Sequence, residues 1–83
     1  MIYDVEFSID AAAELLRISE VIGSAVKVLK AAEMIRRELE GDPSGNGRFL
    51  SEGLYYIDEE PLRAFFIIDV ESMVIEVTDF RIL

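Results

Sequence analysis

The chain has 83 residues and a formal net charge of −9, from 17 acidic and 8 basic side chains. It contains neither cysteine nor histidine, which excludes disulfides, thiolate metal sites and the commonest general base. No apolar run approaches the roughly 20 residues that a membrane span requires. We therefore expect a single small domain over residues 1–83, with no cofactor and no metal, in the reducing cytoplasm.

Charge and hydropathy together favour a protein partner. Nucleic-acid binders need a basic surface to neutralise phosphates, so the acid excess makes direct nucleic-acid binding an unfavourable interpretation. The chain is 52% hydrophobic, with a mean hydropathy of +0.30, which is high for a domain with little interior. We predict that part of this apolar surface is an interface, either with another protein or with a second copy in a homodimer.

The first forty residues predict a strand followed by two helices. Residues 2–8 alternate between apolar and polar side chains, as in a strand with one wet face. Ser8 or Asp10 is expected to cap the first helix, and Ser24 can cap the second, which we place over Ala25–Glu40. The first helix has an expected core stripe of Ala12, Leu15, Leu16 and Ile22. The second has Val28, Ala32, Ile35 and Leu39.

The second half predicts a glycine-rich connection and then three strands. Residues 41–47 contain three glycines but lack the Lys-Ser/Thr ending of a phosphate-binding P-loop, so we interpret them as a plain helix-to-strand loop. The expected strands are Phe49–Ile57, Leu62–Ile68 and Met73–Thr78. The predicted fold is α+β in the order β-α-α-β-β-β, an antiparallel sheet with a helical hairpin packed on one face.

Two helices can cover one face of a small sheet but not both. Alternation places Arg63 on the uncovered face, where we expect it to pair with Glu76 or Asp69. Tyr55 and Tyr56 point to opposite faces, and we assign Tyr55 to the uncovered one. The expected partner-binding residues, which share large apolar side chains, are Phe65, Ile67, Val74, Phe80 and Tyr55.

Short motifs along nearly the whole chain carry a family resemblance. They are Tyr3-x-Val5-x-Phe7-Ser8 before an Ala/Leu-rich helix, Asp42-Pro43, Leu50-x-x-Gly53-x-Tyr55, Leu62-Arg63-Ala64-Phe65-Phe66-Ile67-Ile68-Asp69 and Val74-x-x-Val77. With these motifs the sequence resembles the RelE/ParE superfamily, the toxins of plasmid-stabilisation and type II toxin–antitoxin systems. The resemblance implies a RelE/ParE-like fold and a bacterial toxin-type function.

The resemblance also implies candidate catalytic residues and partners. In ribosome-dependent members, which cleave mRNA, a strand arginine corresponds to Arg63 and a C-terminal basic position to Arg81. Here these two arginines lack the family's usual basic company, and Asp4 and Glu76 on the same face would repel phosphate. ParE-like members instead bind DNA gyrase and need no catalytic set. We therefore expect a binding-type or catalytically degenerate toxin with a cognate antitoxin or DNA gyrase as partner.

Two alternatives stay open at this point. One is a ribosome-dependent mRNA endoribonuclease that uses Arg63 and Arg81 as its catalytic residues. The other is a non-toxic dimerisation or interaction module that keeps only the contact surface. All three functions place their chemistry or their contacts on the uncovered face of the predicted sheet.

Overall fold

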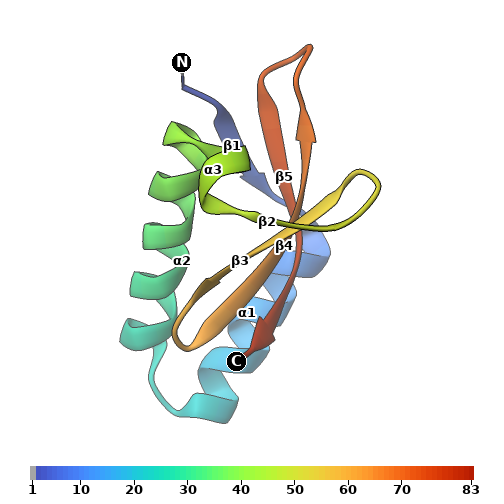
Figure 1. The fold of residues 1–83 in the computed structure, drawn as a ribbon. Coiled ribbons are helices and arrows are strands. Elements are labelled where there is room, and N and C mark those ends of the chain that lie inside the picture. The colour runs from blue at the N-terminus through green and yellow to red at the C-terminus, as the bar shows by residue number, and fades with distance from the viewer. Residues whose placement is uncertain (1) are drawn as a thin grey trace.

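A five-stranded sheet forms the centre of the computed structural model, which describes residues 2–83 (Figure 1). In chain order the elements are β1 (Asp4–Phe7), α1 (Ile9–Ile22), α2 (Ala25–Gly41), α3 (Pro43–Asn46), β2 (Arg48–Ser51), β3 (Leu54–Glu59), β4 (Leu62–Asp69) and β5 (Val74–Ile82). The predicted α+β class and helical hairpin are confirmed. The expected strand over 49–57 is two strands, because Gly53, with a φ of +80°, turns β2 back along β3.

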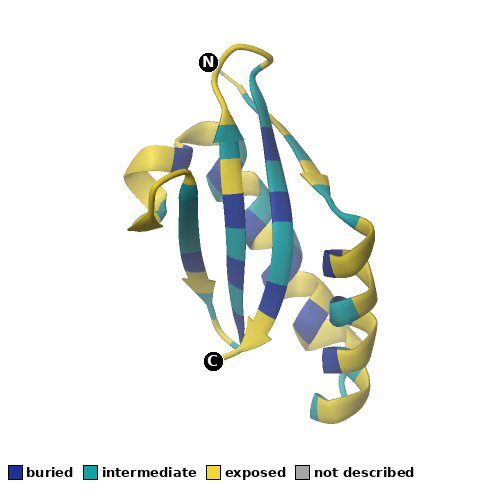
Figure 2. Ribbon diagram, turned by 90° about the vertical axis from the view of Figure 1, so that its right-hand side faces the viewer, coloured by how far each residue is buried: buried dark blue, intermediate teal, exposed yellow. Residues whose placement is uncertain are grey.

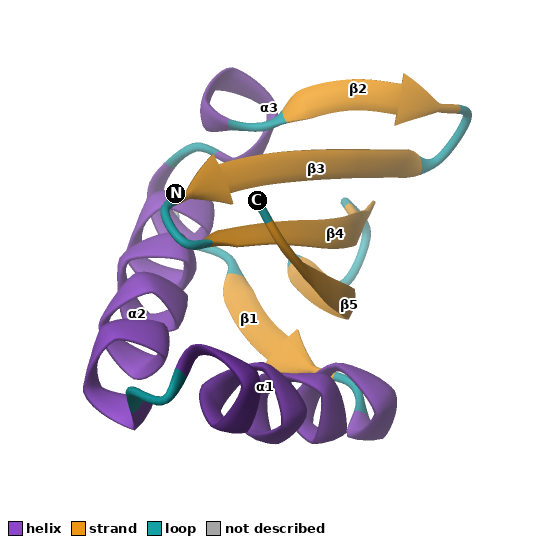
Figure 3. Ribbon diagram, turned by 90° about the horizontal axis from the view of Figure 1, so that it is seen from below, coloured by secondary structure: helices purple, strands orange, loops and turns teal. Residues whose placement is uncertain are grey.

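The strands lie in the order β1-β5-β4-β3-β2. β1 pairs parallel to β5, and the other neighbours pair antiparallel. Figure 3 shows α1 beside β1 and places β2 at the opposite edge, far from α1. The N-terminal strand and the C-terminal strand are therefore neighbours, which closes the sheet around the longest hairpin, β4–β5.

Ser8 sets where α1 begins and ties that end to the sheet. Its Oγ accepts a hydrogen bond from the backbone N–H of Ala11 at 3.0 Å and donates one to the carbonyl of Thr78 at 3.2 Å. α1 then buries Ala11, Leu15 and Ile18. The predicted core stripe is wrong at Ala12 and at Leu16, which is 71% exposed. α1 is apolar on two opposite sides, so periodicity alone did not show which side faces the sheet.

The second helix follows its prediction. Ser24 caps it by accepting from the N–H of Lys27 at 3.3 Å, and all four stripe residues, Val28, Ala32, Ile35 and Leu39, are buried. The loop after it contains the single-turn helix α3. Asp42 accepts from the N–H of Gly45 at 2.9 Å, and Asn46 donates to the carbonyl of Glu38 at 2.9 Å. These bonds make residues 42–47 a capped connection, as the sequence predicts.

The core lies between the two long helices and one face of the sheet. In Figure 2 the strands lie in front of α2, and buried and less buried residues alternate along them. β4 contributes Leu62, Ala64 and Phe66, which are each 0% exposed. Tyr3, Val5 and Phe7 pack partly buried against this core from β1, as predicted.

A β-bulge in β5 moves one predicted surface residue into the core. Phe66 pairs with Val77, but its neighbour Phe65 pairs with Asp79, so Thr78 is an extra residue on β5. Beyond this point the side chains of β5 exchange faces. Phe80 is therefore 1% exposed and meets Phe7 edge to face, with ring centroids 5.3 Å apart. The assignment of Phe80 to the partner-binding surface is wrong for this reason.

Candidate functional site

The face of the sheet that the helices leave uncovered is called here the open face. Register places side chains from three strands on it, in the directly opposed pairs Tyr56–Phe65, Asp58–Arg63, Phe65–Asp79, Arg63–Arg81, Ile67–Glu76 and Asp69–Val74. Figure 2 shows the sheet from a side on which no helix lies in front of β3, β4 and β5. The open face is therefore accessible to a partner along most of the β4–β5 hairpin.

Arg63 is held by Asp58 on the adjacent strand β3. Its Nε lies 2.7 Å from Oδ1 of Asp58 and its Nη2 lies 2.9 Å from Oδ2, a bidentate pair. The guanidinium carbon lies 4.4 Å from the centre of the Tyr56 ring, a cation–π contact. The hydrogen bond from Arg63 lowers the pKa of Asp58 below its ordinary value.

The expected partners of Arg63, Glu76 and Asp69, are wrong. Glu76 lies opposite Ile67, several residues along the strand, whereas Asp58 lies directly opposite Arg63. Asp69 is engaged in the β4–β5 turn, where it accepts from the N–H of Ser72 at 3.3 Å. That hydrogen bond lowers the pKa of Asp69.

Arg81 lies opposite Arg63 on β5, so the structure brings the two candidate catalytic residues together. The Nε of Arg81 lies 3.4 Å from Oδ2 of Asp79, and its guanidinium carbon lies 5.8 Å from the centre of the Phe65 ring. The side chain of Arg81 is 70% exposed. Each arginine of the open face thus has an aspartate and an aromatic ring as its neighbours.

Three predicted contact residues lie on the open face, and one other prediction is corrected. Phe65 and Val74 are half-buried there, and Ile67 is 40% exposed. Tyr55 belongs to the core side, where its ring stacks on Phe66 at a centroid distance of 5.7 Å. Tyr56 takes its place on the open face. The buried Ile57 carries the signal that could have decided this, because residues two apart in a strand share a face.

Phe65 lies at the centre of this surface, between two shallow hollows. The first, of about 380 Å³, is lined by Arg63, Phe65, Arg81, Ile82 and Leu83. The second, of about 290 Å³, is lined by Leu50, Leu54, Phe65, Thr78, Asp79 and Arg81. The sequence analysis missed Leu50 and Leu54, which reach this face because β2 and β3 form a separate hairpin.

The chemistry available on the open face is contact and charge stabilisation. Neither lysine nor histidine occurs among its residues, and Asp58 and Asp79 are engaged by arginines. Within residues 2–83 no group of three or more potential ligands is placed to hold a metal ion. None of the helices in that range is both long and apolar enough to cross a membrane.

Three solved structures share this arrangement of strands and helices. The *toxin–antitoxin complex RelBE2 from Mycobacterium tuberculosis superposes with a TM-score of 0.82 at 19% identity, covering 100% of this chain and 93% of that one. An Escherichia coli RelE toxin with two arginines replaced by alanine, in the free state, gives 0.72 at 17%, covering 96% and 82%. The fold is that of the RelE/ParE toxins.

The chromosomal ParDE system from Pseudomonas aeruginosa shows the same RelE/ParE-like fold, with a TM-score of 0.67 and 22% identity over 99% of this chain and 97% of that one. No protein-family model matches the chain, and no curated protein matches it significantly. The likeness therefore lies in the fold, and the fold predicted from the sequence is confirmed. Function has to be argued from the open face itself.

Proposed function

We propose that this protein is a toxin-type member of a bacterial toxin–antitoxin system that acts by binding another protein through its open face. Two of the structures that share its fold are described as toxin–antitoxin systems, RelBE2 and ParDE. A toxin that works by binding needs a contact surface and no catalytic set. The open face offers such a surface, centred on Phe65 and extended by Ile67 and Val74.

The observation that carries the proposal is the pairing of both open-face arginines with aspartates. Arg63 is held bidentately by Asp58, and Arg81 lies beside Asp79. Paired guanidiniums attract phosphate weakly, because the neighbouring carboxylates cancel their field. RNA cleavage also needs a proton acceptor and a proton donor, and lysine and histidine are missing from this face. A neutralised, partly apolar surface suits a protein partner better.

The proposed partners are a cognate antitoxin, which would keep the toxin inactive in the cytoplasm, and DNA gyrase as the target. Induced expression in a bacterial host tests this proposal, and we expect growth to stop. The purified protein should then inhibit gyrase supercoiling. The variant Ile67→Asp should lose both effects, because it places a charge on the contact surface.

The matched control is Ile9→Asp, which makes the same change on α1, where Ile9 is 88% exposed. It should keep both effects. Unimpeded growth with the parent protein would refute the toxin proposal and favour the non-toxic dimerisation or interaction module. Equal toxicity of both variants would show that the open face is not the contact surface.

A second candidate is a ribosome-dependent endoribonuclease that uses Arg63 and Arg81. The direct opposition of these residues on β4 and β5 favours it, since two guanidiniums side by side can stabilise the charge that develops on phosphate. Sequencing of mRNA 5′ ends after induction separates the two functions. New ends that vanish in Arg63→Ala would support cleavage, whereas an Arg63→Ala protein of unchanged toxicity would eliminate it.

A further inference from the structure

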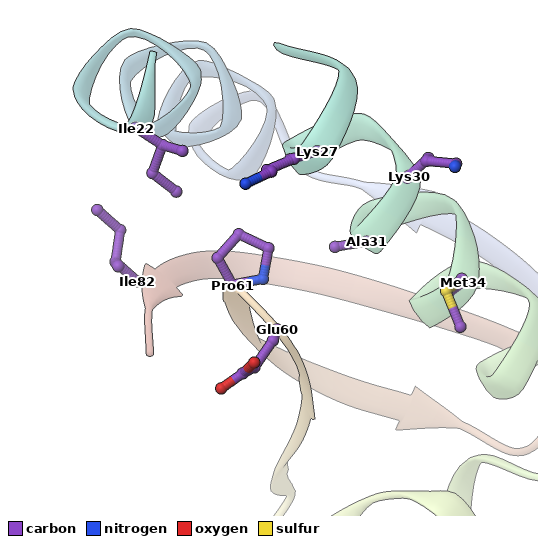
Figure 4. Close-up of a pocket in the computed structure, with 8 residues that line it drawn as sticks. All are labelled: Ile22, Lys27, Lys30, Ala31, Met34, Glu60, Pro61 and Ile82. Carbon is purple, nitrogen blue, oxygen red and sulfur yellow. The ribbon is translucent and has the colours of Figure 1, made fainter. Parts of the chain in front are cut away.

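A second surface lies at the end of the helical hairpin, away from the open face. Here the end of α1, the side of α2, the β3–β4 turn and the end of β5 enclose a groove of about 550 Å³. Figure 4 shows these elements and the side chains that line the groove. The lining residues are Ile22, Lys27, Lys30, Ala31, Met34, Glu60, Pro61 and Ile82. Most of these residues are apolar, so the groove has a hydrophobic floor.

The apolar floor is exposed to a degree that a finished core does not show. Met34 is 49% exposed and Ile82 is 42% exposed. Ile22 packs partly buried against the core next to them. Exposed apolar side chains that lie together in a concave site mark a contact surface rather than isolated surface residues.

The groove also gathers positive charge in a strongly acidic protein. Within residues 2–83, salt bridges to carboxylates engage Arg17, Arg36, Arg37, Arg63 and Arg81. Lys27, Lys30 and Arg48 have no such partner in that range, and two of these three line the groove. In Figure 4, Lys27 points across the groove toward Ile22 and Pro61, whereas Lys30 points outward from α2. The α2 side of the groove is therefore a basic rim.

The opposite side of the groove carries the other sign. Glu60, in the β3–β4 turn, lines it with a side chain that points away from α2 in Figure 4. The charge is thus asymmetric, with cations along α2 and an acid across from them. The α2 side runs from Lys27 to Met34, about 10 Å at the rise of an α-helix. That length matches two turns of a second helix lying alongside.

We propose that this groove docks an amphipathic helix of another protein whose apolar stripe is bordered by carboxylates on the side that faces α2. Apolar residues at helical spacing would fill the space over Met34, Pro61 and Ile82. Aspartates or glutamates along one border would pair with Lys27 and Lys30, and a basic residue on the other border would face Glu60. The inference does not depend on the proposed function of the open face.

Panning the full chain against displayed random peptides of about 15 residues, long enough to form a helix, tests this inference. We expect the selected peptides to combine apolar residues at spacings of three and four with an excess of Asp and Glu. A synthetic peptide from the selection should bind the parent chain in fluorescence anisotropy. Its affinity should fall roughly tenfold, about 1.4 kcal/mol, in Lys27→Glu and in Lys30→Glu, and also in Met34→Glu.

The matched control is Arg48→Glu, which reverses the third basic residue without a carboxylate partner, outside the groove. It changes the net charge by the same amount as each lysine variant and should bind the peptide as the parent does. Equal loss in Arg48→Glu would reduce the effect to net charge and overturn the proposal. Selection of basic or uncharged peptides, or of none, would also overturn it, as would a chain that self-associates through this groove in sedimentation equilibrium.

Discussion

Arg63 and Arg81 lie directly opposite each other on β4 and β5, and each is paired with an aspartate of its own. Like charges opposed across two strands destabilise a sheet, and Asp58 and Asp79 offset that repulsion. The pairing lets a small acidic domain keep two arginines together on an exposed face. It also means that the electrostatic character of the open face depends on two carboxylates.

The burial of Phe80 predicts how the two faces of β5 differ in stability. Replacement of Phe80 by alanine should lower the free energy of unfolding by about 3–5 kcal/mol, because it removes a fully buried ring and its contact with Phe7. Ile67→Ala, on the open face, should cost about 1 kcal/mol, since Ile67 is already partly exposed. Urea denaturation of both variants measures the difference. Equal losses would contradict the facing of β5 beyond Thr78.

Phe80 also shows where sequence reasoning fails in this fold. Strict alternation along Met73–Thr78 places Ile75 and Val77 correctly, because the ladder is regular up to Val77. Extending the same parity to Phe80 fails, since one extra residue reverses the facing. A bulge of this kind comes from the fit of two strands and has no marker in the apolar pattern.

Helix α1 and the β2–β3 hairpin reveal two other limits. Leu16 has the hydrophobicity of a core residue, yet only tertiary packing decides that Leu15 and Ile18 face the sheet instead. The turn at Gly53 was hidden inside an otherwise strand-like run. In contrast, α2 was predicted well, because its charged residues occupy one side and leave a single apolar stripe.

The close approach of Gly47 to Phe66 predicts a position where no side chain fits. A Cβ on Gly47 would lie 2.4 Å from Cζ of Phe66 and 2.8 Å from the carbonyl oxygen of Pro43. Gly47→Ala should therefore destabilise the protein by about 1–3 kcal/mol through overpacking. Gly41→Ala is the control, because a Cβ there meets nothing within 4 Å. Thermal unfolding should show a lower Tm for the first variant and an equal or higher Tm for the second.

The contact of Glu38 with Glu59 predicts a pH dependence of stability. Desolvation, and then the hydrogen bond with Glu59, raises the pKa of Glu38 above its ordinary value of 4.5. The folded state therefore binds a proton more tightly than the unfolded state, and this group loses stability as the pH rises from 4.5 through the raised pKa. Glu38→Gln should be more stable than the parent at pH 7, with the difference shrinking toward pH 4.

The control for this prediction is Glu20→Gln, which changes the net charge by the same amount at an exposed position of α1. It separates the local effect from the general relief of acid repulsion. Chemical denaturation at several pH values measures both variants. A Glu38→Gln protein whose advantage over Glu20→Gln stays constant between pH 4 and pH 7 would contradict the assignment of a raised pKa to Glu38.

The aspartates of the open face predict a gain of RNA affinity when they are neutralised. Asp58→Asn combined with Asp79→Asn leaves Arg63 and Arg81 without carboxylate partners. Two freed guanidiniums should raise the affinity for single-stranded RNA and steepen the dependence of log K on log salt by about 1.4, at roughly 0.7 per phosphate contact. Binding titrations at several salt concentrations measure this slope.

The matched control is Asp10→Asn combined with Glu20→Gln, which removes the same two charges from α1. It should leave the salt slope close to that of the parent, because no cation is uncovered there. If the parent already binds RNA with the steeper slope, then Asp58 and Asp79 do not mask the arginines, and the endoribonuclease function gains support. If only the open-face variant gains affinity, these two carboxylates are what keep the surface suited to a protein partner.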